Sequence, residues 1–226
     1  MKEILKIGLD SVAPVPMHSD YNSAVFEGFE VDLMQEIASQ LNLELHYEIS
    51  LWKHILEKLY KGQLDMICSA VTMTTSRQRI LEFSMPYLQF RLCAVVNIGT
   101  SLYNLNSFDQ KTIGIRIATE AEKYIMGKFP SHDIVHVNRN DELYDLLLKG
   151  EIDVLIDDSP IAGGFLQKHH TLQIAMFMPN THSQYAIAMK KGDTLLKLRV
   201  NEVLSQLKEN GVYQQLYKKW FNYIEL

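Results

Sequence analysis

The sequence has few cysteines, no long hydrophobic run and no excess of positive charge. Two cysteines among 226 residues are too few to define a disulfide framework or a redox compartment. Charged residues interrupt every apolar run well before the roughly 18 residues that suggest a membrane-spanning helix. The formal net charge of −5 argues against a nucleic-acid partner, because no basic stripe is available to displace the counterions of a phosphate backbone.

Common catalytic and metal-binding motifs are also missing. The chain contains no Gly-x-Ser-x-Gly, no phosphate-binding Gly-x-x-x-x-Gly-Lys and no His-Glu-x-x-His. Its eight histidines have no ligand spacing, and His169-His170 is typical of a surface turn. We therefore expect no catalytic residue, no metal and no cofactor.

Two further features bear on the compartment. No signal peptide precedes the first predicted strand, Ile4–Leu9, which indicates either a cytoplasmic protein or a secreted domain whose leader has been removed. Cys68 and Cys93 lie in apolar runs, so we expect buried thiols, with a disulfide between them as the alternative.

What the chain does contain is an ordinary globular composition with alternating strands and helices. It is 47% apolar and 22% charged, and its length suits one large core or two of about 100 residues. Apolar periodicity predicts a helix over Gly28–Leu41, a half-buried strand from Leu43 and a helix from Trp52 that ends before Gly62. This alternation is typical of an α/β layered domain.

An internal sequence repeat suggests two similar α/β lobes. Leu59-Tyr-Lys-Gly-Gln-Leu-Asp-Met-Ile and Leu147-Leu-Lys-Gly-Glu-Ile-Asp-Val-Leu share one pattern, in which a helix ends in Lys-Gly and an apolar strand follows. Gly62 and Gly150 suit the left-handed position after a helix. We expect the lobes to be joined by two ordered strands, Phe90–Asn97 and Gln184–Met189, with the first lobe completed by C-terminal helices.

The segment Asp65–Tyr87 carries the most chemistry. An apolar run ending at Val71 predicts a buried strand, and four hydroxyl residues then precede Arg77. A helix start attracts anions through its N–H groups, and a guanidinium grips both oxygens of a carboxylate. The alternative interpretation is an N-capped helix with one surface arginine.

Five blocks of the chain, taken in order, resemble a known family. GFEVDLMQEIASQLNLE (28–44), TMTTSRQRILEFSMPY (72–87), IGIRIATEAEKY (113–124), DVLIDDSPIAG (153–163) and the stretch 185–221 are similar to blocks of type II periplasmic solute-binding proteins of the polar amino-acid class, family 3. The resemblance implies an α/β fold of two Rossmann-like lobes joined by two hinge strands. Lobe 1 would comprise residues 1–91 and 186–226, and lobe 2 residues 92–185, with the ligand cleft between them.

The resemblance also implies a set of ligand-binding residues. Arg77 would hold the α-carboxylate of an amino acid, assisted by Thr72 and, from the second lobe, Thr119. Asp158 would pair with the α-ammonium, helped by the backbone carbonyl of Ala70. Trp52 would line the first-lobe wall.

Several positions depart from the family pattern. Ala13 stands where an aromatic residue usually stacks on the ligand, so either the pocket is wider or Trp52 or Tyr21 takes that place. Ala118 replaces the common glycine before the second-lobe threonine. Asp157 adjoins Asp158 and is the reserve for the ammonium partner.

The ligand side chain is less defined. Asp10 and Glu120 suit a cationic group, whereas Arg116 suits a carboxylate or amide, and Arg116 and Glu120 pairing with each other is the alternative. Two acids against one base favour a polar or cationic amino acid such as arginine, lysine, ornithine or histidine, with glutamine and glutamate as alternatives.

The resemblance implies a monomeric periplasmic protein that delivers a free amino acid to the permease of an ABC importer. Two other functions fit the same fold. One is an enzyme similar to cyclohexadienyl dehydratases, with Glu120 or Asp157 as general acid or base. The other is the excised ligand-binding domain of a sensor or receptor.

Overall fold

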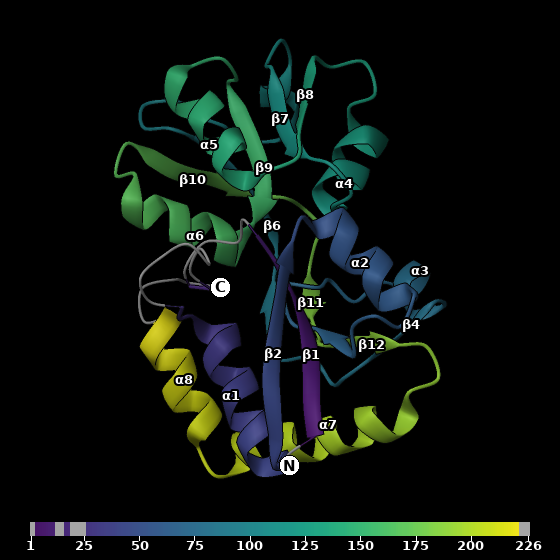
Figure 1. Ribbon diagram of the computed structural model, residues 1–226. Coiled ribbons are helices and arrows are strands. Elements are labelled where there is room, and N and C mark those ends of the chain that lie inside the picture. The colour runs from purple at the N-terminus through teal and green to yellow at the C-terminus, as the bar shows by residue number, and fades with distance from the viewer. Residues whose placement is uncertain (1–2, 12–15, 19–25, 222–226) are drawn as a thin grey trace. The chain divides into compact units, whose positions relative to one another are not determined.

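The computed structural model describes residues 3–11, 16–18 and 26–221 of the chain. Ala13 and Tyr21, which the sequence analysis considered for the ligand wall, lie outside these residues. The chain forms two compact units, one from segments before Phe90 and after His182 and the other from Phe90–His182 (Figure 1).

The first unit contains a five-stranded mixed sheet in the order β2-β1-β3-β12-β4. Strand β1 (Glu3–Asp10) runs parallel to β2 (Leu43–Ser50) and to β3 (Met66–Ile67), and β12 (Ala188–Lys190) is antiparallel to β3 and β4 (Leu81–Phe83). The β1–β2 register pairs Asp10 with Ser50. The carboxyl ends of β1, β2 and β3 therefore lie at one edge of the sheet.

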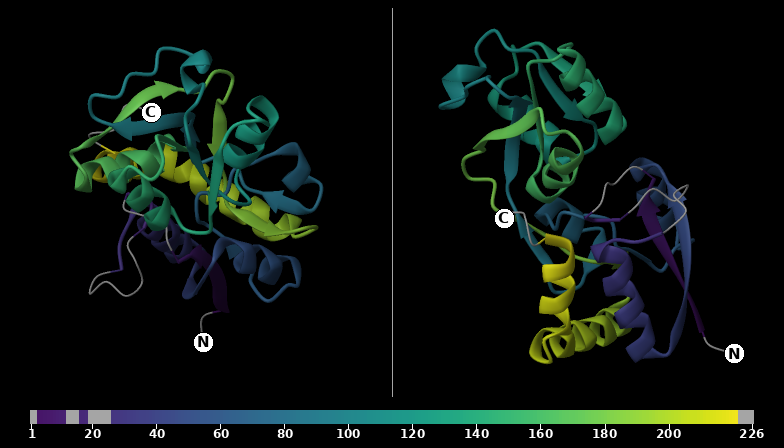
Figure 2. Two further views of the ribbon diagram at one scale, coloured as in Figure 1. Left: turned by 90° about the horizontal axis from the view of Figure 1, so that it is seen from above. Right: turned by 90° about the vertical axis from the view of Figure 1, so that its left-hand side faces the viewer.

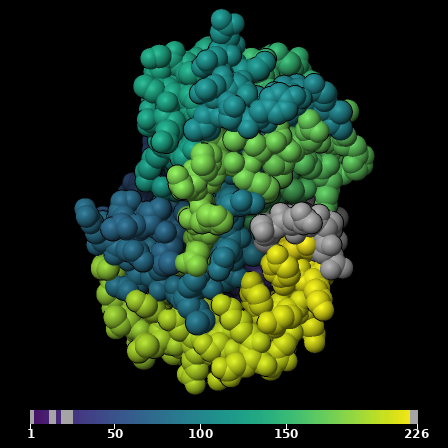
Figure 3. Space-filling view, turned by 180° about the vertical axis from the view of Figure 1, so that it is seen from behind, coloured from purple at the N-terminus to yellow at the C-terminus, as the bar shows by residue number. Residues whose placement is uncertain are grey.

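The described residues of this unit form the helices α1 (Phe29–Leu41), α2 (Trp52–Tyr60), α3 (Thr75–Gln78), α7 (Thr194–Glu209) and α8 (Val212–Phe221). Helix α1 packs against α7, α8 and β2 (Figure 2). It buries Val31, Met34, Ile37 and Ala38, as its predicted stripe requires. Helices α7 and α8 cover an outer face of this unit (Figure 3).

The second unit has a sheet in the order β10-β6-β9-β7-β8. Strand β7 (Ile113–Arg116) is parallel to β8 (Ile134–Val137) and β9 (Val154–Asp158), while β6 (Leu92–Asn97) is antiparallel to β9 and β10 (Leu172–Phe177). Helices α4 (Glu120–Lys128), α5 (Asn140–Lys149) and α6 (Ser159–Lys168) and the 3-10 turn η1 (Leu105–Phe108) complete it. The carboxyl ends of its three parallel strands again share an edge.

The internal sequence repeat corresponds to a helix-ending turn that occurs in both units. Gly62 follows α2 with φ 70° and leads to β3, and Gly150 follows α5 with φ 72° and leads to β9. Left-handed backbone of this kind favours glycine. The predicted helix-ending turns are confirmed.

Two strand predictions are wrong in extent. The apolar segment that ends at Val71 was predicted to be a strand throughout, but only Met66–Ile67 forms one. The expected linking strands Phe90–Asn97 and Gln184–Met189 are each interrupted, giving β5 (Leu88–Phe90) and β6, and β11 (Ser183–Tyr185) and β12. Strands β5 and β11 pair with each other in a separate two-stranded sheet, outside both five-stranded sheets.

Both cysteines are buried and free, Cys68 in the first unit and Cys93 in the second. The expected buried thiols are therefore confirmed. Burial raises the pKa of both thiols well above the usual value.

In the described part of the chain, no helix combines the length and apolar character that crossing a membrane requires.

The start of α1 depends on close backbone packing at Gly28. The N–H groups of Phe29 and Glu30 donate to the carbonyl oxygens of Pro16 (2.8 Å) and Met17 (3.0 Å), which satisfies two donors of the first turn. Gly28 has φ 147°, and a Cβ there would lie 2.3 Å from the Cα of His18 and 2.4 Å from the oxygen of Met17. Only glycine fits this position.

We therefore expect Gly28→Ala to lower the free energy of unfolding by at least about 2 kcal/mol, because it adds both backbone strain and overpacking. Gly127→Ala is the matched control, since Gly127 lies in α4 with no atom within 4 Å of an added Cβ. This control should gain about 0.5–1 kcal/mol through helix propensity. Denaturant unfolding measures both changes, and equal stability of the two variants would contradict the prediction.

Candidate functional site

The residues predicted to bind a ligand gather at the carboxyl edges of the two sheets. In the first unit this edge carries Asp10 at the end of β1, Trp52 after β2 and residues 69–72 after β3. In the second it carries Arg116 to Glu120 after β7 and Asp157–Asp158 at the end of β9. Ligands of open α/β sheets bind outside the carboxyl ends of the strands, so both edges are candidate binding surfaces.

After β3 the backbone turns sharply instead of continuing as a strand. Ala70 adopts φ 50°, and its N–H donates to Oε1 of Glu30 at 2.6 Å. The Ser69 hydroxyl accepts the N–H of Asp10 at 2.9 Å and lies 3.4 Å from Nε2 of His18. These side-chain bonds replace ladder bonds, which explains why the predicted strand stops at Ile67.

Thr72 is buried and forms an isolated antiparallel bridge with Tyr185. The hydrogen bonds of this bridge use its neighbours, with the N–H of Ala186 donating to Val71 and the N–H of Met73 donating to Gln184. In such a pair the N–H and C=O of the bridging residue point away from the partner strand. The amide of Thr72 thus faces the same side as its carbonyl, which accepts from Arg77.

Arg77 is half-buried, and contacts with Thr72 and Trp52 help to hold it. Its Nη1 donates to the carbonyl oxygen of Thr72 at 3.0 Å, and its Cζ lies 5.2 Å from the centroid of the Trp52 ring. A stacked guanidinium is fixed in orientation, and its planar fork matches the geometry of a carboxylate. The structure therefore brings together three of the predicted residues.

The helix start beside Arg77 contributes less than the sequence suggested. Helix α3 has only four residues, and the Thr74 hydroxyl accepts the N–H of Arg77 at 3.2 Å. That N–H is consequently committed to the cap. The anion-binding chemistry of this segment rests on the guanidinium.

Glu30 is a residue that the sequence analysis missed. It is fully buried on α1, and its Oε1 accepts the N–H of Ala70 and the hydroxyl of Tyr87. Burial raises the pKa of Glu30 to about 7 despite these two hydrogen bonds, and the charge of Asp10 acts in the same direction as burial. The sequence does indicate that Glu30 is buried, because it is spaced with Met34, Ile37 and Leu41 so that it lies on the apolar face of the helix.

In the second unit, Arg116 is buried and hydrogen bonded within its own unit. Its Nε donates to the carbonyl oxygen of Asn138 at 3.1 Å, and its Nη1 donates to Oδ1 of Asn140 at 2.8 Å. Asn140 in turn donates to Oδ2 of Asp157 at 2.9 Å, which also accepts the Tyr144 hydroxyl at 3.2 Å. Asn140 and Tyr144 were missed, although with Leu143 and Leu147 they form the buried stripe of α5.

The adjacent aspartates differ in environment. Asp157 is buried in this network, and its Oδ1 accepts the N–H of Asp158 at 2.8 Å. Asp158 is half-buried at the start of α6. Burial raises the pKa of Asp157 to about 6, while its hydrogen bonds and Arg116 oppose that rise. Asp157 therefore supports the edge of the sheet, and Asp158 is the more accessible acid.

Thr119 caps α4 at the same edge. Its hydroxyl donates to the carbonyl oxygen of Arg116 at 2.8 Å and accepts the N–H of Glu122 at 3.2 Å. Ala118 has φ 60°, and its N–H donates to Oε2 of Glu122 at 2.8 Å. Glu120 pairs with Lys123 at 2.7 Å on an exposed surface.

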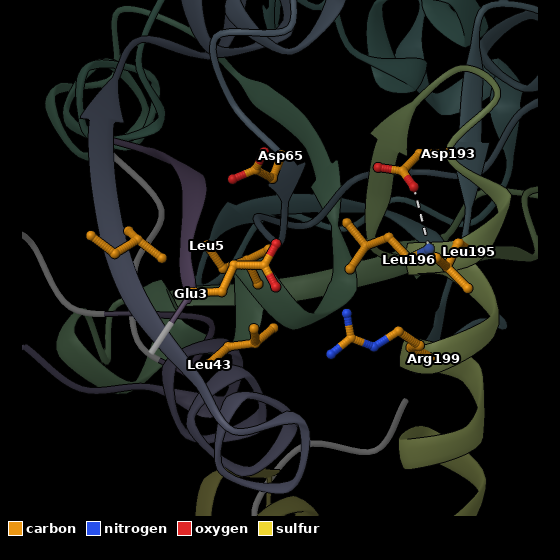
Figure 4. A pocket seen from close by; sticks show the side chains of 9 residues that line it. Glu3, Leu5, Leu43, Asp65, Asp193, Leu195, Leu196 and Arg199 are labelled. Atoms are coloured by element: carbon orange, nitrogen blue, oxygen red, sulfur yellow. Dashed lines mark hydrogen bonds between the residues drawn. The ribbon is translucent and has the colours of Figure 1, made fainter. Parts of the chain in front are cut away.

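A surface hollow of about 190 Å³ lies elsewhere in the first unit, between the start of β1 and the start of α7 (Figure 4). Glu3, Asp65 and Arg199 line it, together with aliphatic side chains. It adjoins the amino end of β1, whereas the predicted ligand residues follow the carboxyl ends of the strands. We do not assign the ligand to this hollow.

Among the described residues, no group of three or more His, Cys, Asp or Glu side chains is placed to hold a metal ion.

Two α/β units, each with polar residues at the carboxyl edge of its sheet, define a two-domain α/β protein of the ligand-binding type. The sequence pattern of the bacterial extracellular solute-binding proteins, family 3, matches residues 5–223. The chain belongs to this family, and the resemblance found in the sequence is confirmed.

Curated relatives agree with this assignment. The chain is 27% identical over 86% of its length to the amino-acid-binding protein AabA of Dichelobacter nodosus, covering 79% of that protein. It is 26% identical over 88% of its length to the ABC transporter glutamine-binding protein GlnH of Bacillus subtilis, covering 74% of that protein.

Solved structures show the same architecture. The arginine-, lysine-, histidine-binding protein ArtJ of Geobacillus stearothermophilus is similar with a TM-score of 0.89 and 25% identity, covering 99% of this chain and 97% of that one. The ancestral amino acid-binding protein AncCDT-1, a precursor of cyclohexadienyl dehydratase, has a TM-score of 0.88 and 26% identity, covering 96% and 95%. The fold is that of a type II periplasmic binding protein, as predicted.

The left-handed alanine at position 118 leads to a stability prediction. Because glycine adopts φ 60° without the Cβ penalty, Ala118→Gly should raise the free energy of unfolding by about 0.5–1 kcal/mol. Ala121→Gly, three residues later inside α4, should lower it by about 1 kcal/mol. Chemical denaturation measures both, and a loss of stability in Ala118→Gly would show that the alanine methyl group is required.

The buried Asp157 gives a pH prediction. Its pKa is raised from 3.8 to about 6, so the folded state keeps this proton to higher pH than the unfolded chain does. Protonated Asp157 therefore adds up to about 3 kcal/mol to the free energy of unfolding. This contribution is complete below pH 3.8 and is lost as the pH rises through 6. The stability of the natural protein relative to Asp157→Asn should therefore fall over this range.

Asp145→Asn is the control for this series, because Asp145 is an exposed carboxylate on the neighbouring helix α5. It measures the effect of removing a carboxylate at an exposed position of the same unit. A stability difference for Asp157→Asn that does not change with pH would contradict the assignment of a raised pKa to Asp157.

Proposed function

We propose that this protein binds one free amino acid between its two units, which act as closing lobes, and delivers it to an ABC importer. The observation that carries the proposal is the stacked, half-buried guanidinium of Arg77 beside the outward-facing amide of Thr72. A zwitterion that loses its water on closure needs a fixed cation for its carboxylate and a fixed acid for its ammonium. Family membership supports the same function.

In this proposal the α-carboxylate binds to the first lobe. Arg77 supplies two parallel donors, and the N–H of Thr72 supplies a third. Trp52 keeps the guanidinium in place and forms part of the wall. Thr119 approaches from the second lobe with the backbone N–H groups near its cap.

The α-ammonium binds Asp158, helped by the carbonyl oxygen of Ala70. Asp157 is less suited to this role, since its two oxygens already accept hydrogen bonds from Asn140, Tyr144 and the amide of Asp158. Placing the acid in one lobe and the guanidinium in the other makes the closed form the tighter binder.

For the ligand side chain we propose a cationic amino acid, with glutamine or another polar amino acid as the alternative. Arg116 is committed to Asn138 and Asn140, which weakens the argument for an acidic ligand. Asp10 and Glu120 are acidic side chains at the carboxyl edges of the two sheets, and an acidic side chain suits a cationic ligand. ArtJ is described as binding arginine, lysine and histidine, and GlnH as binding glutamine, so both classes occur among the similar proteins.

The remaining expectations belong to the same proposal. The family is described as extracellular, and we propose that this protein acts in the periplasm as a monomer. Its closed form would dock on the permease of the importer, which opens it and accepts the ligand.

A thermal-shift screen of the twenty amino acids, ornithine and citrulline tests this function. A ligand at 100 times its dissociation constant should add about 2.7 kcal/mol of stability. Arg77→Ala should abolish the shift for every ligand, because it removes the carboxylate clamp. Glu120→Ala should instead alter the ranking of ligands.

Arg79→Ala is the matched control, since Arg79 is an exposed arginine two residues further along the chain. It should bind as the natural protein does. Retention of full binding by Arg77→Ala would refute the carboxylate assignment.

A dehydratase-like enzyme is the second candidate, favoured by the structural similarity to a precursor of cyclohexadienyl dehydratase. It requires an acid or base beside the substrate. Asp157 is hydrogen bonded inside its unit and Glu120 pairs with Lys123, so neither supports that role. Turnover of prephenate or arogenate by the purified protein would favour the enzyme, and tight amino-acid binding without turnover would favour the transport function.

A further inference from the structure

We propose that Glu30 is a positioning residue for ligand binding: its buried carboxylate holds the turn at residues 69–72 in the conformation that presents the Ala70 carbonyl and the Thr72 amide. This inference rests on the proposed function for its effect on affinity. The hold of Glu30 on the turn does not depend on any ligand.

The first step is geometric. Ala70 has φ 50°, a left-handed conformation that is unfavourable for any residue other than glycine. It persists only where surrounding groups fix it. The 2.6 Å hydrogen bond from its N–H to Oε1 of Glu30 is the contact that fixes the amide plane next to Ala70. The direction of the residues that follow depends on that plane.

The second step concerns the rigidity of Glu30 itself. The side chain is fully buried on α1, and the Tyr87 hydroxyl donates to the same Oε1. Helix α1 is in turn fixed at its start by the carbonyl oxygens of Pro16 and Met17. Oε2 has no hydrogen-bond partner among the described residues. Among the described residues, Glu30 therefore accepts both of its hydrogen bonds through Oε1.

The third step links this contact to charge. Hydrogen bonds to an ionised carboxylate are roughly twice as strong as those to a neutral group. A protonated Glu30 consequently holds the Ala70 amide less firmly. Because burial raises the pKa of Glu30 to about 7, this change occurs near neutral pH. Ligand affinity should rise as the pH rises through that value.

Other titratable groups face this cluster from each neighbouring element. Asp10 lies on β1, Cys68 follows β3, and Tyr87 precedes β5. The pKa values of Cys68 and Tyr87 are raised well above their usual range, so neither titrates near neutral pH. His18 lies beside Ser69 and is the group to be controlled for.

The first experiment needs no ligand. Nuclear magnetic resonance of the uniformly ¹⁵N-labelled protein should show the Ala70 amide titrating with a midpoint near pH 7. Glu30→Gln should remove that titration, since the amide oxygen of glutamine accepts the same bonds but cannot ionise. Titration of the Ala70 amide that is unchanged in Glu30→Gln would overturn the proposal.

Tyr87→Phe gives an independent variant in case Glu30→Gln does not fold. The Tyr87 hydrogen bond lowers the pKa of Glu30, so its loss should move the Ala70 midpoint to higher pH. His18→Gln should leave the midpoint in place. A midpoint that disappears in His18→Gln would assign the titration to the histidine and overturn the proposal.

The second experiment measures affinity by calorimetry, with the amino acid that gives the largest thermal shift. At pH 8.5 the natural protein should bind about tenfold more tightly than Glu30→Gln, which corresponds to a shift of about one pKa unit in Glu30 on binding. At pH 5.5 the two should agree within about twofold, because both carry a neutral side chain.

Glu36→Gln is the matched control, a half-exposed glutamate on the same helix, and should bind like the natural protein at both pH values. A merely structural defect in Glu30→Gln would weaken binding equally at both pH values, and that result would overturn the proposal. If no amino acid binds the natural protein, the proposed function fails, while the Ala70 titration still decides the role of Glu30.

Discussion

The hydrogen bond from the Ala70 amide to the buried Glu30 carboxylate connects the core of the first unit to its candidate ligand surface. On one side it is anchored by α1, whose first turn is closed by residues 16–17. On the other it sets the turn that carries Thr72, the residue whose carbonyl holds Arg77. We therefore expect a change in α1 or at Glu30 to alter the position of the guanidinium, although neither is proposed to touch a ligand.

The second unit contains a similar turn after one of its parallel strands. Its parallel strand β7 is also followed by a left-handed alanine, Ala118, and the N–H of that alanine also donates to a glutamate, Glu122. The difference lies in burial, because Glu122 sits half-exposed on α4, whereas Glu30 is enclosed. Enclosure raises the pKa of Glu30 to about 7, so the turn at Ala70 depends on a carboxyl group that exchanges its proton near neutral pH.

Much of the fold could be predicted from the sequence, and the reason is periodicity. The stripes of α1 and α2, the glycine turns at 62 and 150 and the alternation of strands with helices are local patterns, and each appears where it was expected. The candidate site residues were named through the family resemblance, and the structure places them at the carboxyl edges of the two sheets. Their roles toward a ligand remain predictions.

What the sequence could not reveal depends on contacts between distant segments. The strand expected up to Val71 stops at Ile67 because Ser69 and Ala70 bond to Asp10 and Glu30, which lie far away in the chain. Glu30 and Asn140 look like surface residues at a helix start, and only their spacing with later apolar residues marks them as buried. The commitment of Arg116 to Asn138 and Asn140 likewise depends on how β7 and α5 meet.

The place of β12 in the first sheet has a consequence for biosynthesis. This short strand lies between β3 and β4, yet more than a hundred residues separate it in sequence from β4. As the nascent chain emerges, the segment Phe90–His182 has every strand of its own sheet before residues 188–190 have been translated. The inserted unit therefore has every strand of its sheet in one continuous segment, whereas the sheet of the first unit is completed only by residues near the end of the chain, and its strand edges stay unpaired until then.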